Sequence, residues 1–127
     1  MKSLKVKFVF FVLTSIIIVN CDTDSASDEI SRDWRSDNNG CKEIRLKIVQ
    51  EQYAVLEKKI IGQNINYIIE KLGKPNEVWQ GPKSTVYVYW VSKGAQCLDG
   101  LDEDTDALRI LIDVKGEKVM DIRKFIS

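Results

Sequence analysis

The chain has 127 residues, with 19 basic and 19 acidic side chains and no histidine. Its length predicts one domain, and 44% hydrophobic with 30% charged residues is typical of a globular protein rather than a disordered or fibrous one. The zero net charge argues against a nucleic-acid-binding protein, and the missing histidine excludes histidine zinc ligands and a histidine general base.

The first twenty residues are typical of a secretory signal peptide and are set apart from the fold. Lys2, Lys5 and Lys7 precede an apolar run from Phe8 to Val19. This run is shorter than the roughly 20 apolar residues that a membrane-spanning helix needs. An uncleaved N-terminal anchor is the alternative. Residues 1–20 carry three basic residues and no acidic residue, so their removal leaves a net charge of −3.

The end of the apolar run, Ile18-Val19-Asn20-Cys21, resembles the lipobox of bacterial lipoproteins. In that motif the cysteine is lipidated and becomes the first mature residue; Asn20 departs from the small residue that is usual before it. The resemblance implies an acylated Cys21 that anchors the protein on a membrane, which needs more than one acyl chain to be stable. The small, polar and acidic residues 21–31 then predict a flexible tether.

Export leaves Cys41 and Cys97 in an oxidising compartment, where paired cysteines usually form disulfides. A bridge between them closes a loop of roughly 57 residues, for which the chain-entropy model gives about 4 kcal/mol. Two free buried thiols are the alternative. A metal site is disfavoured because there is no C-x-x-C spacing, and redox catalysis because there is no adjacent resolving cysteine.

The domain over residues 32–127 is expected to begin with Trp34 as an anchor, followed by two helices. Apolar residues recur three and four apart between Cys41 and Ile60, which predicts the first helix. The second helix is predicted from Ile65 to Leu72, with Asn64 as N-cap and Gly73 and Pro75 ending it.

The second half of the domain predicts an antiparallel sheet. Residues 85–91 are dense in β-branched and aromatic side chains, and residues 107–114 and 119–126 flank a tight turn at Lys115-Gly116. Residues 77–80 are a shorter candidate strand, with a turn at Gly81-Pro82. Consecutive strands after helices predict an α+β fold, with two helices on one face of a three- or four-stranded antiparallel sheet.

The segment from Ile61 to Phe125 resembles the SmpA/OmlA, or BamE-like, family of small envelope lipoproteins. The shared order is a helix, Leu72-Gly73-Lys74-Pro75, an aromatic strand (Val88-Tyr89-Trp90), an aliphatic strand ending at Asp113, and a turn from Lys115 to Val119. The resemblance implies a two-layer sandwich, location in the cell envelope and no catalysis. The same fold hosts unrelated functions, so the family alone does not specify the role.

Two short motifs lie outside that family pattern. One is W-x-x-D-x-x-G-C-x-x-x-R, from Trp34 to Arg45, and the other is G-x-Q-C, from Gly94 to Cys97. They resemble a branch of cysteine-containing small lipoproteins. They set this chain apart from the outer-membrane assembly subunit itself.

No motif for an enzyme, a cofactor or a metal stands out. The acidic stretch from Asp99 to Asp106 has D-x-D-x-D spacing, but Ala107 and Asp113 occupy the positions where a calcium loop of the EF-hand type needs Gly and Glu. A solvated loop that keeps a sheet edge soluble is the alternative. We therefore expect no catalytic residue, no cofactor, no metal and no small-molecule substrate.

The aromatic residues Trp34, Tyr87, Tyr89 and Trp90 are the candidates for contact with a partner. If Trp90 faces the helices, Tyr87 and Tyr89 face outward as interface residues; alternatively, the tyrosines line the core. We expect a non-catalytic envelope lipoprotein that binds an envelope protein, with the outer membrane favoured over the inner one. The alternative is an inhibitor or immunity-like lipoprotein that blocks an enzyme or toxin.

Overall fold

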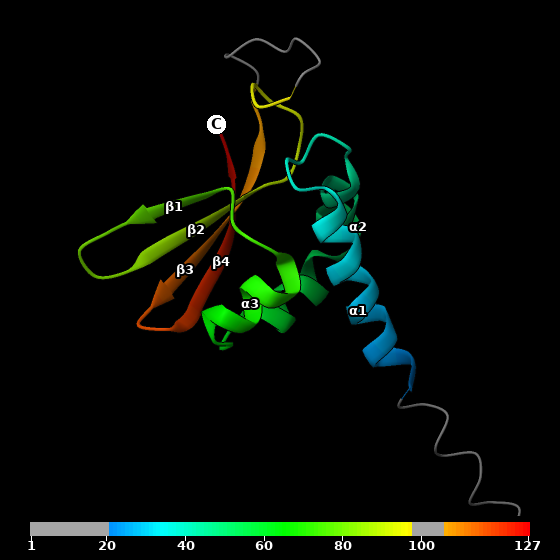
Figure 1. Cartoon of the computed structure of the whole chain (residues 1–127), viewed down its shortest axis with the longest axis horizontal. Coiled ribbons are helices and arrows are strands. Elements are labelled where there is room, and N and C mark those ends of the chain that lie inside the picture. The colour runs from blue at the N-terminus through cyan, green and yellow to red at the C-terminus, as the bar shows by residue number, and fades with distance from the viewer. Residues whose placement is uncertain (1–20, 98–105) are drawn as a thin grey trace, which may run out of the picture.

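A computed structural model describes residues 21–97 and 106–127. Within them, three helices precede four strands: α1 (Cys21–Ser36), α2 (Ile44–Ile60), α3 (Ile65–Leu72), β1 (Glu77–Gln80), β2 (Thr85–Trp90), β3 (Leu108–Lys115) and β4 (Lys118–Ile126) (Figure 1). The expected signal peptide, and the acidic loop up to residue 105, lie outside the described residues. In the part that is described, no helix is long and apolar enough to cross a bilayer.

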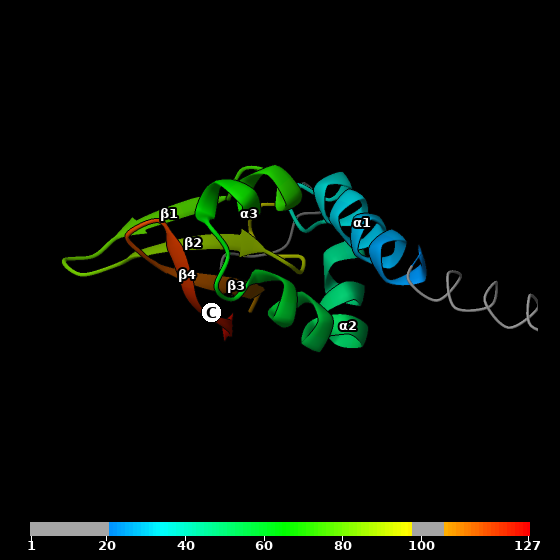
Figure 2. The same cartoon turned by 90° about the horizontal axis from the view of Figure 1, so that it is seen from below.

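The four strands form one antiparallel sheet in the order β1-β2-β3-β4, which confirms the predicted α+β fold. Each strand pairs with the next one along the chain, so short turns suffice between β1 and β2 and between β3 and β4. Figure 2 shows the helices gathered at one side of the twisted sheet, with the β1–β2 hairpin extending beyond them.

Helix α3 has the bounds that its end signals predicted. The side chain of Asn64 accepts a hydrogen bond from the backbone N–H of Asn66, and Gly73 ends the helix with a φ of 83°. Ile65, Ile68 and Leu72 are buried on one face. Capping and the 3.6-residue period are both local, which is why the sequence defines this helix well.

Helix α2 begins three residues later than predicted and is kinked. Glu43 lies in the left-handed region (φ 65°), so the chain cannot be helical before Ile44, and Gln52 interrupts the helix with φ −135° and ψ 26°. The kink shifts the buried face along the helix. The buried residues are therefore Arg45, Ile48, Val49, Leu56 and Ile60 rather than one continuous stripe.

The predicted tether over residues 21–31 is the main difference between prediction and structure. The structure continues helix α1 through these residues, and Ile30 and Ser31 are only 7% and 3% exposed. The physical reason is the i, i+4 spacing of Ile30 and Trp34, which places both on the helix face that packs on the domain. The domain therefore begins before residue 32, and it has three helices rather than two.

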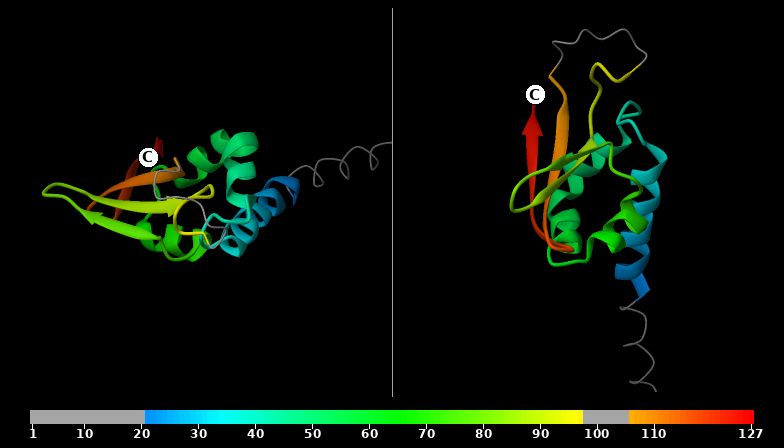
Figure 3. Two further views of the ribbon diagram at one scale, coloured as in Figure 1. Left: turned by 90° about the horizontal axis from the view of Figure 1, so that it is seen from above. Right: turned by 60° about the vertical axis from the view of Figure 1, so that its left-hand side comes forward.

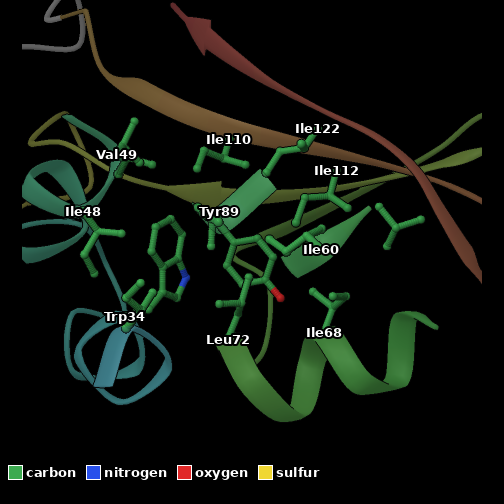
Figure 4. Packing of buried hydrophobic residues seen from close by; sticks show 14 of the residues in the cluster. Trp34, Ile48, Val49, Ile60, Ile68, Leu72, Tyr89, Ile110, Ile112 and Ile122 are labelled. Carbon is green, nitrogen blue, oxygen red and sulfur yellow. The ribbon is translucent and has the colours of Figure 1, made fainter. Parts of the chain in front are cut away.

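The main core lies between the helices and one face of the sheet (Figure 4). It contains Trp34 from α1, Leu56 from α2, Ile68 from α3 and, from the sheet, residues such as Tyr89, Ile110, Ile112 and Ile122. At the margin of the core, α2 contacts the edge strand β4. The Tyr53 hydroxyl donates a hydrogen bond to the Ile122 carbonyl (3.4 Å), and the Lys124 ammonium lies 4.4 Å from the centre of the Tyr53 ring.

Candidate functional site: an aromatic face of the sheet

Two of the four aromatic residues predicted to contact a partner belong to the core. Trp34 and Tyr89 are both 0% exposed, with ring centroids 6.1 Å apart in an edge-to-face arrangement. The Tyr89 hydroxyl donates to the Gly73 carbonyl (2.8 Å). The prediction that Trp34 and Tyr89 bind a partner is therefore wrong.

Strand alternation explains the position of the tyrosines. Tyr87 pairs with Ile112 and Tyr89 with Ile110, and these partners face the helices. Tyr87 is half-buried and packs against the same core. The alternative in which the tyrosines line the core is the one the structure adopts.

The tryptophan-to-arginine motif forms a buried network at the α1–α2 corner, which we call the corner network. Arg45 is 1% exposed; its Nε donates to the Trp34 carbonyl (3.0 Å), and its Nη1 donates to the carbonyls of Asn38 (3.2 Å) and Trp90 (3.0 Å) and to Oδ1 of Asn76 (3.1 Å). The motif is thus a structural connection between the helices and the end of β2.

Burial lowers the pKa of Arg45 to about 10, an effect that the Asp37 carboxylate opposes. The guanidinium is therefore charged at neutral pH. The Asp37 carboxylate accepts hydrogen bonds from the backbone N–H groups of Lys42, Ile44 and Arg45, at 3.0, 3.0 and 3.2 Å. A carboxylate in this position satisfies donors that the start of α2 leaves free. Sequence reasoning placed these residues in a motif but did not predict that the arginine is buried.

The predicted disulfide is present. Cys41 and Cys97 are bonded, with their Cα atoms 5.7 Å apart and a sequence separation of 56. The bridge joins the α1–α2 corner to the segment after β2. Beside it, the Gln96 side-chain amide donates to the carbonyls of Asn39 (3.1 Å) and Ser92 (3.0 Å). The second motif, like the first, is structural.

The opposite face of the sheet carries an aromatic cluster, which we call the aromatic face. It comprises Trp79 on β1, Val88 and Trp90 on β2, Leu111 on β3 and Phe125 on β4, which share one side by strand register. All three helices contribute to the core on the other side. The views in Figure 3 show how strongly the sheet twists.

The twist brings the two edges of this face together. In a flat four-stranded sheet, β1 and β4 lie about 14 Å apart, yet the rings of Trp79 and Phe125 meet edge to face at 6.5 Å between centroids. Val88 and Leu111, at the centre of this face, are 0% and 2% exposed. The rings remain accessible, since Trp79 is 38% and Phe125 39% exposed.

Charged side chains share this face with the aromatic cluster and occur in pairs. Arg109 lies 3.6 Å from the Glu77 carboxylate, which also accepts a hydrogen bond from the Trp90 indole N–H (2.9 Å). Arg123 pairs with Asp113 on the neighbouring strand. Aromatic and arginine side chains are both enriched at protein interfaces.

The sequence pointed to Trp90 as a candidate for contact with a partner but not to Trp79 or Phe125. Their juxtaposition depends on strand order and sheet twist, which local patterns do not reveal. Among the described residues, no three His, Cys, Asp or Glu side chains form a group able to hold a metal ion. Comparison of the chain with protein-family models, curated proteins and solved structures found no match.

Proposed function

We propose that this chain is a lipid-anchored cell-envelope protein, similar to the BamE-like lipoproteins, that binds a protein partner through its aromatic face and catalyses no reaction. The observation that carries the interaction is the exposed pair of Trp79 and Phe125 over a buried aliphatic centre. Aromatic residues of this kind are enriched at the centres of protein interfaces.

Anchoring at Cys21 is supported by the sequence Ile18-Val19-Asn20-Cys21 at the end of the apolar run. Within the described residues, helix α1 runs from that cysteine to Ser36. A lipid on Cys21 would therefore be joined to the domain by a helix rather than by a flexible tether. The proposal favours the outer membrane over the inner one.

Labelling with palmitate tests the anchor. The full chain should incorporate label, and Cys21→Ser should abolish the incorporation. Cys41→Ser is the matched control, because the structure places that cysteine in a disulfide; its incorporation should remain. Label retained by Cys21→Ser contradicts the lipid anchor.

Site-specific crosslinking in the native cells tests the aromatic face. A photoreactive phenylalanine analogue replaces Phe125 in one strain and the exposed Val55 of α2, which is 48% exposed, in the control strain. We expect one protein adduct from position 125, absent from position 55 and lost when Trp79→Ala is added.

The identity of the crosslinked protein distinguishes an accessory role in envelope assembly from an inhibitory role. A component of envelope assembly supports an accessory role there, whereas a single hydrolase or toxin supports an inhibitor. Equal adducts from positions 125 and 55 contradict the proposed face.

A further inference from the structure

A second surface feature lies in the helical layer, away from the aromatic face. It is a cleft of about 260 Å³ between α1 and α2. Its apolar lining comes from Ile30, Ile44 and Ile48, and its polar lining from Glu29, Asp33, Lys47, Glu51 and Gln52. The kink of α2 at Gln52 lies at one end of this lining, where the helix departs from a regular path.

The charges of the cleft are unbalanced. Glu29, Asp33 and Glu51 oppose a single cation, Lys47. No carboxylate among these three has an ion-pair partner within 4.0 Å in the part of the chain that the structure describes. On other parts of the described surface, Asp113 pairs with Arg123 and Asp28 with Lys71.

The size of the cleft limits what it can hold. Pockets for drug-sized ligands are roughly 300–1,000 Å³, so this cleft is better matched to one or two protein side chains. Ile30 and Ile48, which line the cleft, are 7% and 8% exposed. An aliphatic side chain of a partner can contact these isoleucines while cations on the same segment reach the acids of the lining.

We propose that the α1–α2 cleft binds a cationic, amphipathic segment of a protein partner, with one aliphatic side chain entering the cleft and lysine or arginine side chains facing Glu29, Asp33 and Glu51. The charge of the cleft identifies the partner's chemistry, and recognition of an amphipathic helix in a groove is a common mode of binding. This inference does not depend on the aromatic face or on the lipid anchor.

A synthetic helical peptide of Leu-Lys-Lys-Leu repeats is the probe, with the full chain in a nonionic detergent. Its counterpart with Glu in place of every Lys is the peptide control. The test variant is Glu29→Lys/Glu51→Lys, and the matched variant is Glu70→Lys/Asp121→Lys, which changes the net charge equally at exposed sites outside the cleft. Affinity and backbone amide chemical shifts are measured for each.

We expect the lysine peptide to shift the amide signals of Ile44 and Ile48 and the glutamate peptide to leave them unchanged. Reversing two charges within the cleft should weaken the affinity about tenfold or more, whereas the matched variant keeps most of it. If both variants weaken the affinity equally, the effect comes from net charge alone and the proposal is overturned. Absence of binding of the lysine peptide would overturn it as well. Trp79→Ala/Phe125→Ala should still bind the lysine peptide, and this result distinguishes the cleft from the aromatic face.

Discussion

Arg45 holds Trp34 in two ways. Its guanidinium lies 4.9 Å from the centre of the indole ring, and its Nε donates a 3.0 Å hydrogen bond to the Trp34 carbonyl. One side chain therefore fixes both the ring and the backbone at the end of α1. Because the same guanidinium reaches the Trp90 carbonyl, the position of the helices and the end of β2 are coupled.

Replacing Arg45 should destabilise the domain strongly. Arg45→Met removes the charge but leaves the carbonyls of Trp34, Asn38 and Trp90 without this donor, so we expect a loss of about 3 kcal/mol or more in the free energy of unfolding. Urea denaturation followed by tryptophan fluorescence measures it. Lys58→Ala, at an exposed position of the same helix, should stay within about 0.5 kcal/mol. Similar values for the two variants would contradict a structural role for the corner network.

A comparison of substitutions at Gly40 and Gly116 separates the cost of backbone strain from the cost of steric crowding. Both have positive φ, 71° and 65°, but a Cβ on Gly40 would lie 2.8 Å from the Trp90 carbonyl oxygen, whereas one on Gly116 meets nothing within 4 Å. We expect Gly116→Ala to cost about 1 kcal/mol from backbone strain alone. Gly40→Ala should cost about 2–4 kcal/mol, since crowding adds to the strain. Equal thermal shifts for the two variants would contradict the close packing of Gly40 on β2.

The early start of helix α1 is tested at Ile30. Ile30→Ala should cost about 2–4 kcal/mol, because its side chain is buried against the domain. Arg32→Ala, two residues further on and exposed, is the control and should stay within about 0.5 kcal/mol. If residues 21–31 behave as a tether in solution, both substitutions will leave the urea midpoint unchanged.

Reduction of the Cys41–Cys97 disulfide should lower stability without a change in fold. From the length of the closed loop we expect a loss of about 4 kcal/mol in the free energy of unfolding, because reduction increases the conformational entropy of the unfolded chain. Urea denaturation with and without a thiol reductant measures the difference. Cys41→Ser/Cys97→Ser should match the reduced protein and show no response to reductant. A wild-type protein equally stable under both conditions would indicate that the bond contributes little.

Tyr89 predicts a dependence of stability on alkaline pH. Burial raises the pKa of Tyr89 above its ordinary value of 10.0, against a smaller opposing effect of Arg45. Above pH 10 the unfolded chain releases this proton and the folded chain retains it, so stability contributed by Tyr89 is present below pH 10 and is lost as the pH rises.

The comparison with Tyr89→Phe isolates this contribution. At neutral pH the variant should lose about 1 kcal/mol, because it lacks the hydrogen bond to the Gly73 carbonyl. Between pH 10 and 12 the wild type should lose stability relative to the variant. The difference in their free energies of unfolding should change by up to about 1.4 kcal/mol per pH unit in favour of the variant. Parallel pH profiles for the two proteins would contradict the raised pKa.

The elements that the sequence predicted well are those with local causes. Helix α3 was predicted with its bounds because Asn64, Gly73 and the spacing of its isoleucines act within a few residues. The antiparallel meander followed from strands joined by short turns. The disulfide followed from the number of cysteines left once Cys21 was assigned to a lipid.

The elements that the sequence did not predict depend on distant contacts. Residues 21–29 are polar, and only packing at Ile30 and Trp34 reveals that this segment belongs to the folded domain. Arg45 lies among charged residues that are exposed, and its burial requires carbonyls from three separate segments. The contact of Trp79 with Phe125 requires the complete sheet.

The contact between Tyr53 and Ile122 affects how the edge of the sheet can pair with other molecules. Strand β4 is an edge of the sheet, and an edge strand offers unpaired backbone groups to neighbouring molecules. Here the Tyr53 hydroxyl already engages the Ile122 carbonyl, and Lys118, Asp121, Arg123 and Lys124 make the strand highly charged. Charged side chains of this kind disfavour the pairing of an edge strand with another molecule, so we expect β4 to resist sheet-to-sheet association between copies of the domain.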